Sequence, residues 1–371
     1  MSMMKAARLH EIGGRFIVDE VNMPKPAPND VLVKVKASGV IPNLKNVTTH
    51  FPEWYPFLPL PELPAIFGLD SAGVITAVGS SVTAFKEGDR VYVNPGIGCG
   101  ECRFCNEGNA TRCNSYTFMG YFGFGSGSKE VFKRYPYAGY GQYMTAPGNS
   151  LVRLPDSLDF SIAARFGYLG TAYSAIKKSQ LRASQSIMVL GASGTLGLSA
   201  TLLALAFGAS KVFAVARDPK ALERLKALDP KRVIPIQMNS ESESISEQVL
   251  SHLSDGVDVM LDTLGAKAPI KLFTDGMQAV SRGGRIVQIG GVEGPIPIEP
   301  HLFMCLQLQY IGSLWFTPAE GEELAKMFEA GVLDFSLLEQ HAYPLEKINE
   351  ALEDIESKGN GFMNFYISHD I

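Results

Sequence analysis

The sequence predicts a two-domain α/β protein, in which an antiparallel, strand-rich domain is followed by a doubly wound parallel sheet. The chain has 371 residues, of which 46% are hydrophobic, and this is too long a chain for a single hydrophobic core. Its first part consists of short alternating runs punctuated by Gly and Pro, such as residues 31–37 and 89–94. Its later part alternates helical segments with compact apolar strands, which is typical of a parallel sheet.

These patterns give the expected domain organisation. We expect the first domain to span residues 1–160 and the second to span residues 161–316. The apolar strands of the second domain are expected at residues 186–190, 212–216, 257–262 and 285–289. Residues 317–371 contain two predicted helices (319–330 and 345–357) and a final strand near 363–367, and this segment is expected to rejoin the first domain.

Charge and hydropathy exclude some classes of function. A net charge of −5, spread along the sequence, argues against a nucleic-acid or anionic-membrane partner. No apolar run reaches the roughly 18 to 20 residues of a membrane span. Because no cleavable signal peptide precedes residue 30, we expect a cytoplasmic protein.

Four of the five cysteines fall within one short lobe, residues 95–115. Cys99, Cys102 and Cys105 are spaced Cys-x-x-Cys-x-x-Cys, and Cys113 follows. Four thiolates can hold one Zn²⁺ at about 2.3 Å in a closed tetrahedron, which makes such a site structural. The alternative, two disulfides, needs an oxidising compartment, so we expect zinc.

The first strand of the second domain leads into a glycine-rich turn that opens an apolar helix. The turn consists of Gly191, Ala192, Ser193, Gly194, Thr195, Leu196 and Gly197. Gly194 would let backbone N–H groups approach a pyrophosphate, and Gly197 would let the helix pack closely on the strand. A purely structural glycine turn is the alternative, but the strand before it and the helix after it favour a dinucleotide site.

The end of the next strand indicates which cofactor is bound. An acidic residue there would hold the ribose diol of NAD, but Ala216 occupies this position and is followed by Arg217 and Asp218, with Lys220 nearby. Guanidinium matches phosphate geometry, so we expect NADP, with NAD possible. In the alternative interpretation Arg217 is only an exposed charge at a helix start and Asp218 binds the ribose.

A further pattern accompanies the cysteine lobe and the glycine turn: Gly68-Leu69-Asp70-x-x-Gly73, Gly79, Val82 and Gly88-Asp89-x-Val91. From Lys5 to Ile367, the chain resembles the medium-chain dehydrogenase/reductase superfamily, specifically its zinc-type alcohol dehydrogenase branch. The resemblance implies a GroES-like catalytic domain built from both chain ends, a Rossmann domain and an active site in the cleft between them. It also implies that Thr171 lies against the nicotinamide. We further expect a homodimer or homotetramer.

The chain departs from this branch at its catalytic centre. The three positions that usually hold the catalytic zinc carry Ile41, Leu69 and Gly167, and none of these side chains can bind a metal. Asn43 stands at the position of the usual relay serine or threonine, and Asn46 where a relay histidine often sits. The resemblance therefore predicts one structural zinc and no catalytic zinc.

Without this Lewis acid, hydride must go to an activated acceptor, or a protein group must replace the metal. We therefore expect an NAD(P)H-dependent reductase of an activated C=C or C=O in a small apolar, aromatic or conjugated substrate: an enone, quinone, iminium, aldehyde or ketone. Two alternatives remain. One is an alcohol dehydrogenase that oxidises a bulky apolar alcohol through a protein base, and the other is a nucleotide-binding protein that has lost catalysis.

The candidate catalytic residues lie in segments that the resemblance places at the active site: Asn43, His50, Tyr55, Asp70 and Tyr168. His50 and Tyr55 could instead belong to an aromatic loop that packs on the core. Asp70 could act as a general acid only if burial raises its pKa, and would otherwise be a supporting hydrogen-bond partner. The aromatic residues between 116 and 143 suit an apolar substrate wall, although some could simply cover the sheet or a dimer surface.

Overall fold

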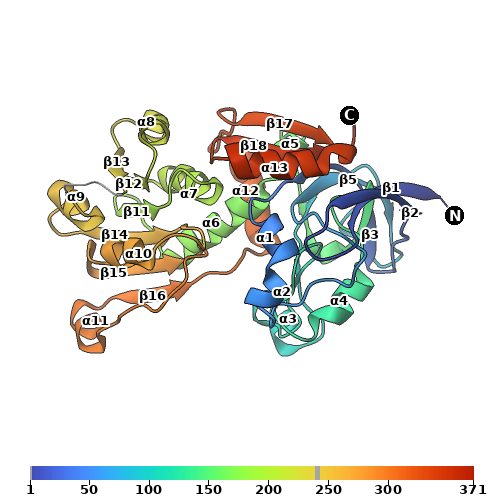
Figure 1. Cartoon of the computed structure of the whole chain (residues 1–371), viewed down its shortest axis with the longest axis horizontal. Helices are drawn as coiled ribbons and strands as arrows, with labels where there is room; N and C mark the ends of the chain where they lie inside the picture. The colour runs from blue at the N-terminus through green and yellow to red at the C-terminus, as the bar shows by residue number, and fades with distance from the viewer. Residues whose placement is uncertain (1, 239–242) are drawn as a thin grey trace. The chain divides into compact units, whose positions relative to one another are not determined.

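The computed structural model describes residues 2–238 and 243–371. The chain folds as two compact units. Unit 1 comprises Met1–Gly167, Trp315–Gly359 and Met363–Ile371, and unit 2 comprises Tyr168–Leu314 and Asn360–Phe362. Unit 1 is thus built from both ends of the chain, which the blue and red segments of Figure 1 show.

Unit 1 is centred on a seven-stranded sheet with the order β10-β6-β5-β3-β18-β17, in which β9 also pairs with β3. Its strands are β3 (Asp30–Gly39), β5 (Ser71–Val78), β6 (Arg90–Val93), β9 (Tyr143–Pro147), β10 (Leu151–Arg153), β17 (Glu339–Pro344) and β18 (Met363–Ser368). Smaller sheets are formed by β1 (Met3–Leu9), β2 (Phe16–Asn22) and β4 (Ala65–Ile66), and by β7 (Gly96–Ile97) and β8 (Thr117–Phe118). Because β18 pairs with β3, the final strand lies beside a strand from the N-terminal part of the chain.

The helices of unit 1 are short in its N-terminal part and longer near the C-terminus. They are α1 (Leu44–Thr49), α2 (Phe51–Trp54), α3 (Arg103–Asn106), α4 (Ser128–Arg134), α5 (Phe160–Ala163), α12 (Pro318–Glu329) and α13 (Ile348–Lys358). Alternate residues of β3, Val31, Val33 and Val35, enter a buried core with Ile75 of β5 and Val91 of β6. This period of two is the pattern that predicts half-buried strands, and it is confirmed here.

Unit 2 is a six-stranded parallel sheet with the order β13-β12-β11-β14-β15-β16. Its strands are β11 (Ser186–Leu190), β12 (Lys211–Ala216), β13 (Val233–Gln237), β14 (Val257–Asp262), β15 (Val280–Gln288) and β16 (Gln309–Gly312). The four predicted strands are confirmed. The sequence analysis missed β13, which contains Pro235, and β16, whose residues are mostly exposed, because neither shows a continuous apolar run.

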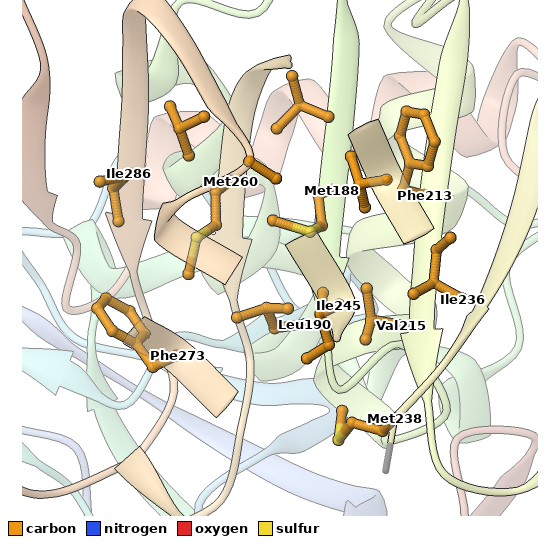
Figure 2. Packing of buried hydrophobic residues seen from close by; sticks show 14 of the residues in the cluster. Met188, Leu190, Phe213, Val215, Ile236, Met238, Ile245, Met260, Phe273 and Ile286 are labelled. Carbon is orange, nitrogen blue, oxygen red and sulfur yellow. The ribbon is translucent and has the colours of Figure 1, made fainter. Parts of the chain in front are cut away.

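Six helices accompany the sheet: α6 (Phe166–Ser179), α7 (Thr195–Ala206), α8 (Pro219–Leu228), α9 (Ile245–His252), α10 (Ile270–Met277) and α11 (Pro300–Leu306). On one face of the sheet, Met188 of β11 and its neighbour Phe213 of β12 pack in a cluster with Ile245 of α9 and Phe273 of α10 (Figure 2). Within residues 2–238 and 243–371, no helix combines the length and the hydropathy needed to cross a bilayer.

Candidate active site and cofactor-binding residues

The cysteine lobe brings four thiols together in unit 1. The ligand atoms of Cys99, Cys102, Cys105 and Cys113 all lie within 4.8 Å of one another, and all four are free thiols rather than disulfides. The backbone N–H of Cys102 donates to Cys99 Sγ at 3.3 Å, and that of Ser115 donates to Cys113 Sγ at 3.3 Å. Backbone N–H groups of Glu101 and Cys102 lower the pKa of the Cys99 thiol to about 7. The donor set fits one zinc ion held by four thiolates.

The glycine-rich turn of unit 2 has the backbone geometry of an anion site. Gly191 has a φ of +82°, and its N–H and that of Ala192 both donate to Val215 O on β12. Gly194 is the N-cap of α7, and no described side chain caps this helix end, so its first N–H groups are left for an anionic ligand. A Cβ at Gly197 would lie 2.2 Å from Gly191 O, so the close approach of α7 to the turn requires glycine.

Residues 360–362, from the C-terminal part of the chain, lie beside this glycine turn. The N–H of Gly361 donates to Ser193 O at 2.8 Å, and a Cβ at Gly361 would lie 2.6 Å from Gly194 O. The guanidinium of Arg224 on α8 lies 3.9 Å from the centroid of the Phe362 ring. Residues 360–362 therefore support both the glycine turn and the helix that follows β12.

The carboxyl end of β12 carries the residues that the sequence assigns to the ribose. Ala216 is buried as the last residue of the strand, whereas Arg217 and Lys220 are exposed. Asp218 is the N-cap of α8, and its Oδ1 accepts the N–H of Lys220 at 3.0 Å. The Asp218 carboxylate, which the alternative interpretation assigns to the ribose, therefore caps α8 through its Oδ1.

In unit 1, the three positions to which the family resemblance assigns the catalytic zinc ligands carry no side chain that can bind a metal. Ile41 and Leu69 are both buried and apolar. Gly167 has the carboxylate of Asp70 directly against it, since a Cβ at Gly167 would lie 2.4 Å from Asp70 Oδ1 and 2.5 Å from Oδ2. The Asp70 carboxylate therefore occupies the space that a ligand side chain at position 167 would need.

Asp70 is enclosed by protein. Its exposed fraction is 1%, the Tyr92 hydroxyl donates to its Oδ1 at 2.6 Å, and the backbone N–H of Gly167 is a second hydrogen-bond donor. Burial raises the pKa of Asp70 to about 7, although both hydrogen bonds oppose this shift. Burial, the charge of Asp70 and the hydrogen bond to it raise the pKa of Tyr92 well above its usual value, so the Tyr92 phenol stays protonated.

A second phenol, Tyr121, is also buried, with an exposed fraction of 5%. Burial raises its pKa, the side chain of Asn43 lowers it, and the negative charge of Asp70 raises it. Asn43 is the N-cap of α1, and its Oδ1 accepts from Asn46 Nδ2 at 2.9 Å.

Tyr92, the partner of Asp70, was not predicted from the sequence. It lies in β6 as one of several alternating residues, and the local pattern indicates only that its side chain is buried. Nothing in the sequence says that its hydroxyl meets Asp70, which lies in another segment.

The remaining predicted catalytic residues have other surroundings. His50 is exposed and stacks on Trp54 with ring centroids 4.6 Å apart. Tyr55 is half-buried and packs its edge on Phe51 at 4.9 Å. The contact of Tyr55 with the buried Phe51 fits a loop that packs on the core, whereas His50 and Trp54 are both exposed. Tyr168 is half-buried on α6 in unit 2, and Thr171 is buried one turn further along the same helix.

Much of the aromatic stretch packs inside unit 1. Phe122 packs against Phe51 of α2 at 5.3 Å, and Phe118 packs against Trp315 at 4.5 Å. The hydroxyl of Tyr135 donates to Asp30 Oδ1 at 2.9 Å, and that of Tyr140 donates to Gly39 O at 3.3 Å. Phe118, Tyr135 and Tyr140 are buried, so these members of the stretch belong to the core.

Comparison with known proteins agrees with this architecture. Residues 27–156 match the family described as alcohol dehydrogenase GroES-like domain, and residues 195–330 match the family described as zinc-binding dehydrogenase. The chain is 30% identical over 353 residues to an alcohol dehydrogenase of Moraxella sp. (strain TAE123), with 94% of this chain and 95% of the relative covered. It is 30% identical over 365 residues to the quinone oxidoreductase of Homo sapiens, with 95% and 94% covered.

Among solved structures, the crystal structure of AibC has a TM-score of 0.83 and 26% sequence identity, with 99% of this chain and 96% of that chain covered. Sequence and structure thus agree over nearly the whole length of both units. The chain belongs to the medium-chain dehydrogenase/reductase superfamily.

Proposed function

We propose that this protein is an NADP(H)-dependent reductase that transfers hydride to an activated C=C or C=O of a small apolar substrate without a catalytic zinc. Relatives named alcohol dehydrogenase and quinone oxidoreductase support an NAD(P)-dependent oxidoreductase. When bound, the dinucleotide would supply the hydride. The protein would supply its binding site, the substrate surface and the proton.

The contact between Asp70 and Gly167 carries the proposal. Ile41 and Leu69 cannot bind a metal, and the Asp70 carboxylate fills the space of a third ligand at Gly167. These three positions therefore cannot form the Lewis-acid site that stabilises the alkoxide of a simple alcohol. An acceptor that spreads the arriving charge onto a conjugated oxygen or nitrogen depends least on such a site.

The surroundings of β12 support NADP(H) as the cofactor. Arg217 and Lys220 are exposed at the carboxyl end of the strand, and the Asp218 carboxylate caps α8. Two exposed cations at this strand end suit a 2′-phosphate.

A panel assay at the nicotinamide absorbance tests the proposal. The panel contains 4-phenyl-3-buten-2-one, 9,10-phenanthrenequinone, benzaldehyde, ethanol and benzyl alcohol, each with NADP(H) and NAD(H). We expect NADPH-dependent reduction of the enone or the quinone, with little oxidation of ethanol. Zinc-dependent turnover of ethanol or benzyl alcohol would overturn the proposal, and absence of turnover throughout would favour a non-catalytic nucleotide-binding protein.

We also propose that the chain forms a homodimer through the edge of the parallel sheet. Strand β16 lies at this edge, and its Tyr310 is 42% exposed. Leu302 and Met304 of the neighbouring α11 are 47% and 64% exposed. Exposed strand edges with apolar side chains tend to pair. Light scattering should give a dimer mass that falls to the monomer mass in Leu302→Glu/Met304→Glu, whereas a monomeric wild type would contradict this assembly.

A further inference from the structure

We propose that residues 360–362 position the dinucleotide, and that Gly361 is the residue that sets the glycine turn for the pyrophosphate. This inference rests on the dinucleotide binding proposed above and assigns a role to a segment outside the turn itself. Residues 360–362, which we call the strap, follow α13 in the chain but belong to unit 2 together with the turn.

The strap holds one peptide group of the turn, the group between Ser193 and Gly194. Its oxygen, Ser193 O, accepts the N–H of Gly361 at 2.8 Å, and its N–H, on Gly194, donates to Gly191 O at 3.0 Å. The C=O and N–H of a trans peptide point in opposite directions. Each end of this peptide group therefore has its own partner, and the bond to Gly361 fixes the direction of the carbonyl.

The direction of this carbonyl matters to an anionic ligand. Gly194 is the N-cap of α7, and the first N–H groups of the helix form the donor set for a pyrophosphate. A carbonyl oxygen turned toward these donors would repel the anion, because both carry negative charge. While Ser193 O is bonded to Gly361, it cannot turn toward the helix end.

The contact between the strap and the turn requires glycine at position 361. A Cβ at Gly361 would lie 2.6 Å from Gly194 O and 2.8 Å from Ser193 O. Both oxygens are backbone atoms, so they cannot swing aside as the end of a long side chain can. An added methyl group must therefore push the strap away from the turn or displace both carbonyls. This close contact of two backbones carries the inference.

The neighbours of Gly361 hold it against the turn. Oδ1 of Asn360 accepts the N–H of Phe362 at 2.9 Å, which closes a local turn around Gly361. The Phe362 side chain is buried, and the guanidinium of Arg224 lies 3.9 Å from the centroid of its ring. A side-chain hydrogen bond and a buried ring thus fix the strap on both sides of Gly361.

The proposed role predicts a distinct pattern of ligand affinities. NADPH and NADH carry the same pyrophosphate, so loss of the strap contact should weaken both by the same factor. Arg217, in contrast, is expected to act on the 2′-phosphate of NADPH alone. Adenosine 2′-monophosphate has no pyrophosphate, and its binding should not depend on the strap. A strap that only stabilised the fold of unit 2 would weaken all three ligands alike.

The experiment compares Gly361→Ala, Asn360→Ala and Asn360→Ser in the full-length protein by titration calorimetry with the three ligands. We expect Gly361→Ala to raise the Kd of NADPH and of NADH by about 5–10-fold, the effect of one lost hydrogen bond. Its Kd for adenosine 2′-monophosphate should stay within about twofold. Asn360→Ala should weaken both dinucleotides, and Asn360→Ser, which keeps a hydroxyl acceptor, should restore part of the loss. The control, Ser357→Ala, changes an exposed side chain of α13 and should match the wild type.

Hydrogen–deuterium exchange without ligand gives a second readout. In Gly361→Ala, peptides that cover residues 191–198 should exchange faster than in the wild type, because the Ser193–Gly194 peptide group is no longer held. Peptides that cover β15 should keep the wild-type rate. Faster exchange throughout unit 2 would show that the strap stabilises the fold rather than the turn, and would overturn the inference.

The outcomes separate this inference from the function on which it rests. If the wild type binds neither NADPH nor NADH, the dinucleotide function fails and the role of the strap fails with it. If the wild type binds and Gly361→Ala binds both dinucleotides equally well, only the role of the strap is overturned. If Gly361→Ala does not fold, Asn360 decides: weaker binding in Asn360→Ala with recovery in Asn360→Ser supports the inference, and unchanged binding overturns it.

Discussion

The carboxylate of Asp70 lies against the α-carbon of Gly167, so close that a Cβ there would lie 2.4 Å from Oδ1. Asp70 belongs to the segment that leads into β5, and Gly167 lies at the start of α6. The two residues therefore constrain each other. A side chain at position 167 is incompatible with the buried carboxylate, and the carboxylate is held in place by the Gly167 N–H.

Gly167→Ala tests this constraint. We expect the substitution to destabilise unit 1 by about 1–3 kcal/mol, because the added methyl group overpacks a closed site. Urea unfolding followed by tryptophan fluorescence measures it, since both tryptophans, Trp54 and Trp315, belong to unit 1. Gly265→Ala, where a Cβ would meet nothing within 4 Å, is the control. Equal stability of Gly167→Ala and wild type would contradict the contact.

Asp70→Asn should change how stability depends on pH. Asp70 titrates near 3.8 when unfolded and at about 7 when folded, so the folded state keeps a proton that the unfolded state has lost. The free energy of unfolding of the wild type should therefore fall as pH rises from about 4 to 7. Above that range, it should be lower by about 4 kcal/mol. Asparagine does not titrate.

The same fluorescence-detected unfolding, at pH 4.5 and pH 8, measures this difference. Asp70→Asn should gain stability relative to wild type as pH rises, whereas Glu87→Gln, a change at an exposed carboxylate in unit 1, should follow the wild-type profile. Parallel profiles for wild type and Asp70→Asn would show that Asp70 is ionised throughout this range in the folded protein.

We expect about one zinc per chain, bound by the four thiols of the lobe. Elemental analysis should show that Cys113→Ser loses the metal, because three thiolates no longer close the site. Cys305→Ser removes an exposed thiol outside the lobe and should keep one zinc. Two zinc ions per wild-type chain would contradict the proposal that no catalytic zinc is bound.

Arg217→Ala should weaken NADPH binding by about 1–3 kcal/mol, the size of a lost charge-assisted contact, and leave NADH nearly unchanged. Titration calorimetry with both cofactors measures this. Lys226→Ala, which removes an exposed cation from the last turn of α8, should bind both cofactors like wild type. A native preference for NADH would refute the role of Arg217.

Much of the fold could be predicted from the sequence because periodicity is local. The predicted strands at residues 186–190 and 257–262 coincide with β11 and β14, and the last strand, β18, pairs with β3. The cysteine lobe and the glycine turn could also be found, because each lies within one short segment.

The surroundings of Asp70 could not be predicted, because their members come from distant segments. The hydroxyl of Tyr92 on β6 and the N–H of Gly167 at the start of α6 both bond to the Asp70 carboxylate, and no local pattern encodes that meeting. The pKa of Asp70 likewise depends on enclosure by Tyr92 and Gly167, which only the folded chain supplies. Sequence reasoning could identify Asp70 as a candidate but could not decide its protonation.

The hydrogen bond from Gly361 to Ser193 has a consequence for dissecting this chain. Residues 360–362 enter unit 2 only three residues before β18 begins in unit 1. A recombinant fragment cut as one continuous piece, residues 168–314, would lack the residues that support the glycine turn and the ring beneath Arg224. Unit 2 is therefore discontinuous along the sequence, and it is complete only once residue 362 has been translated.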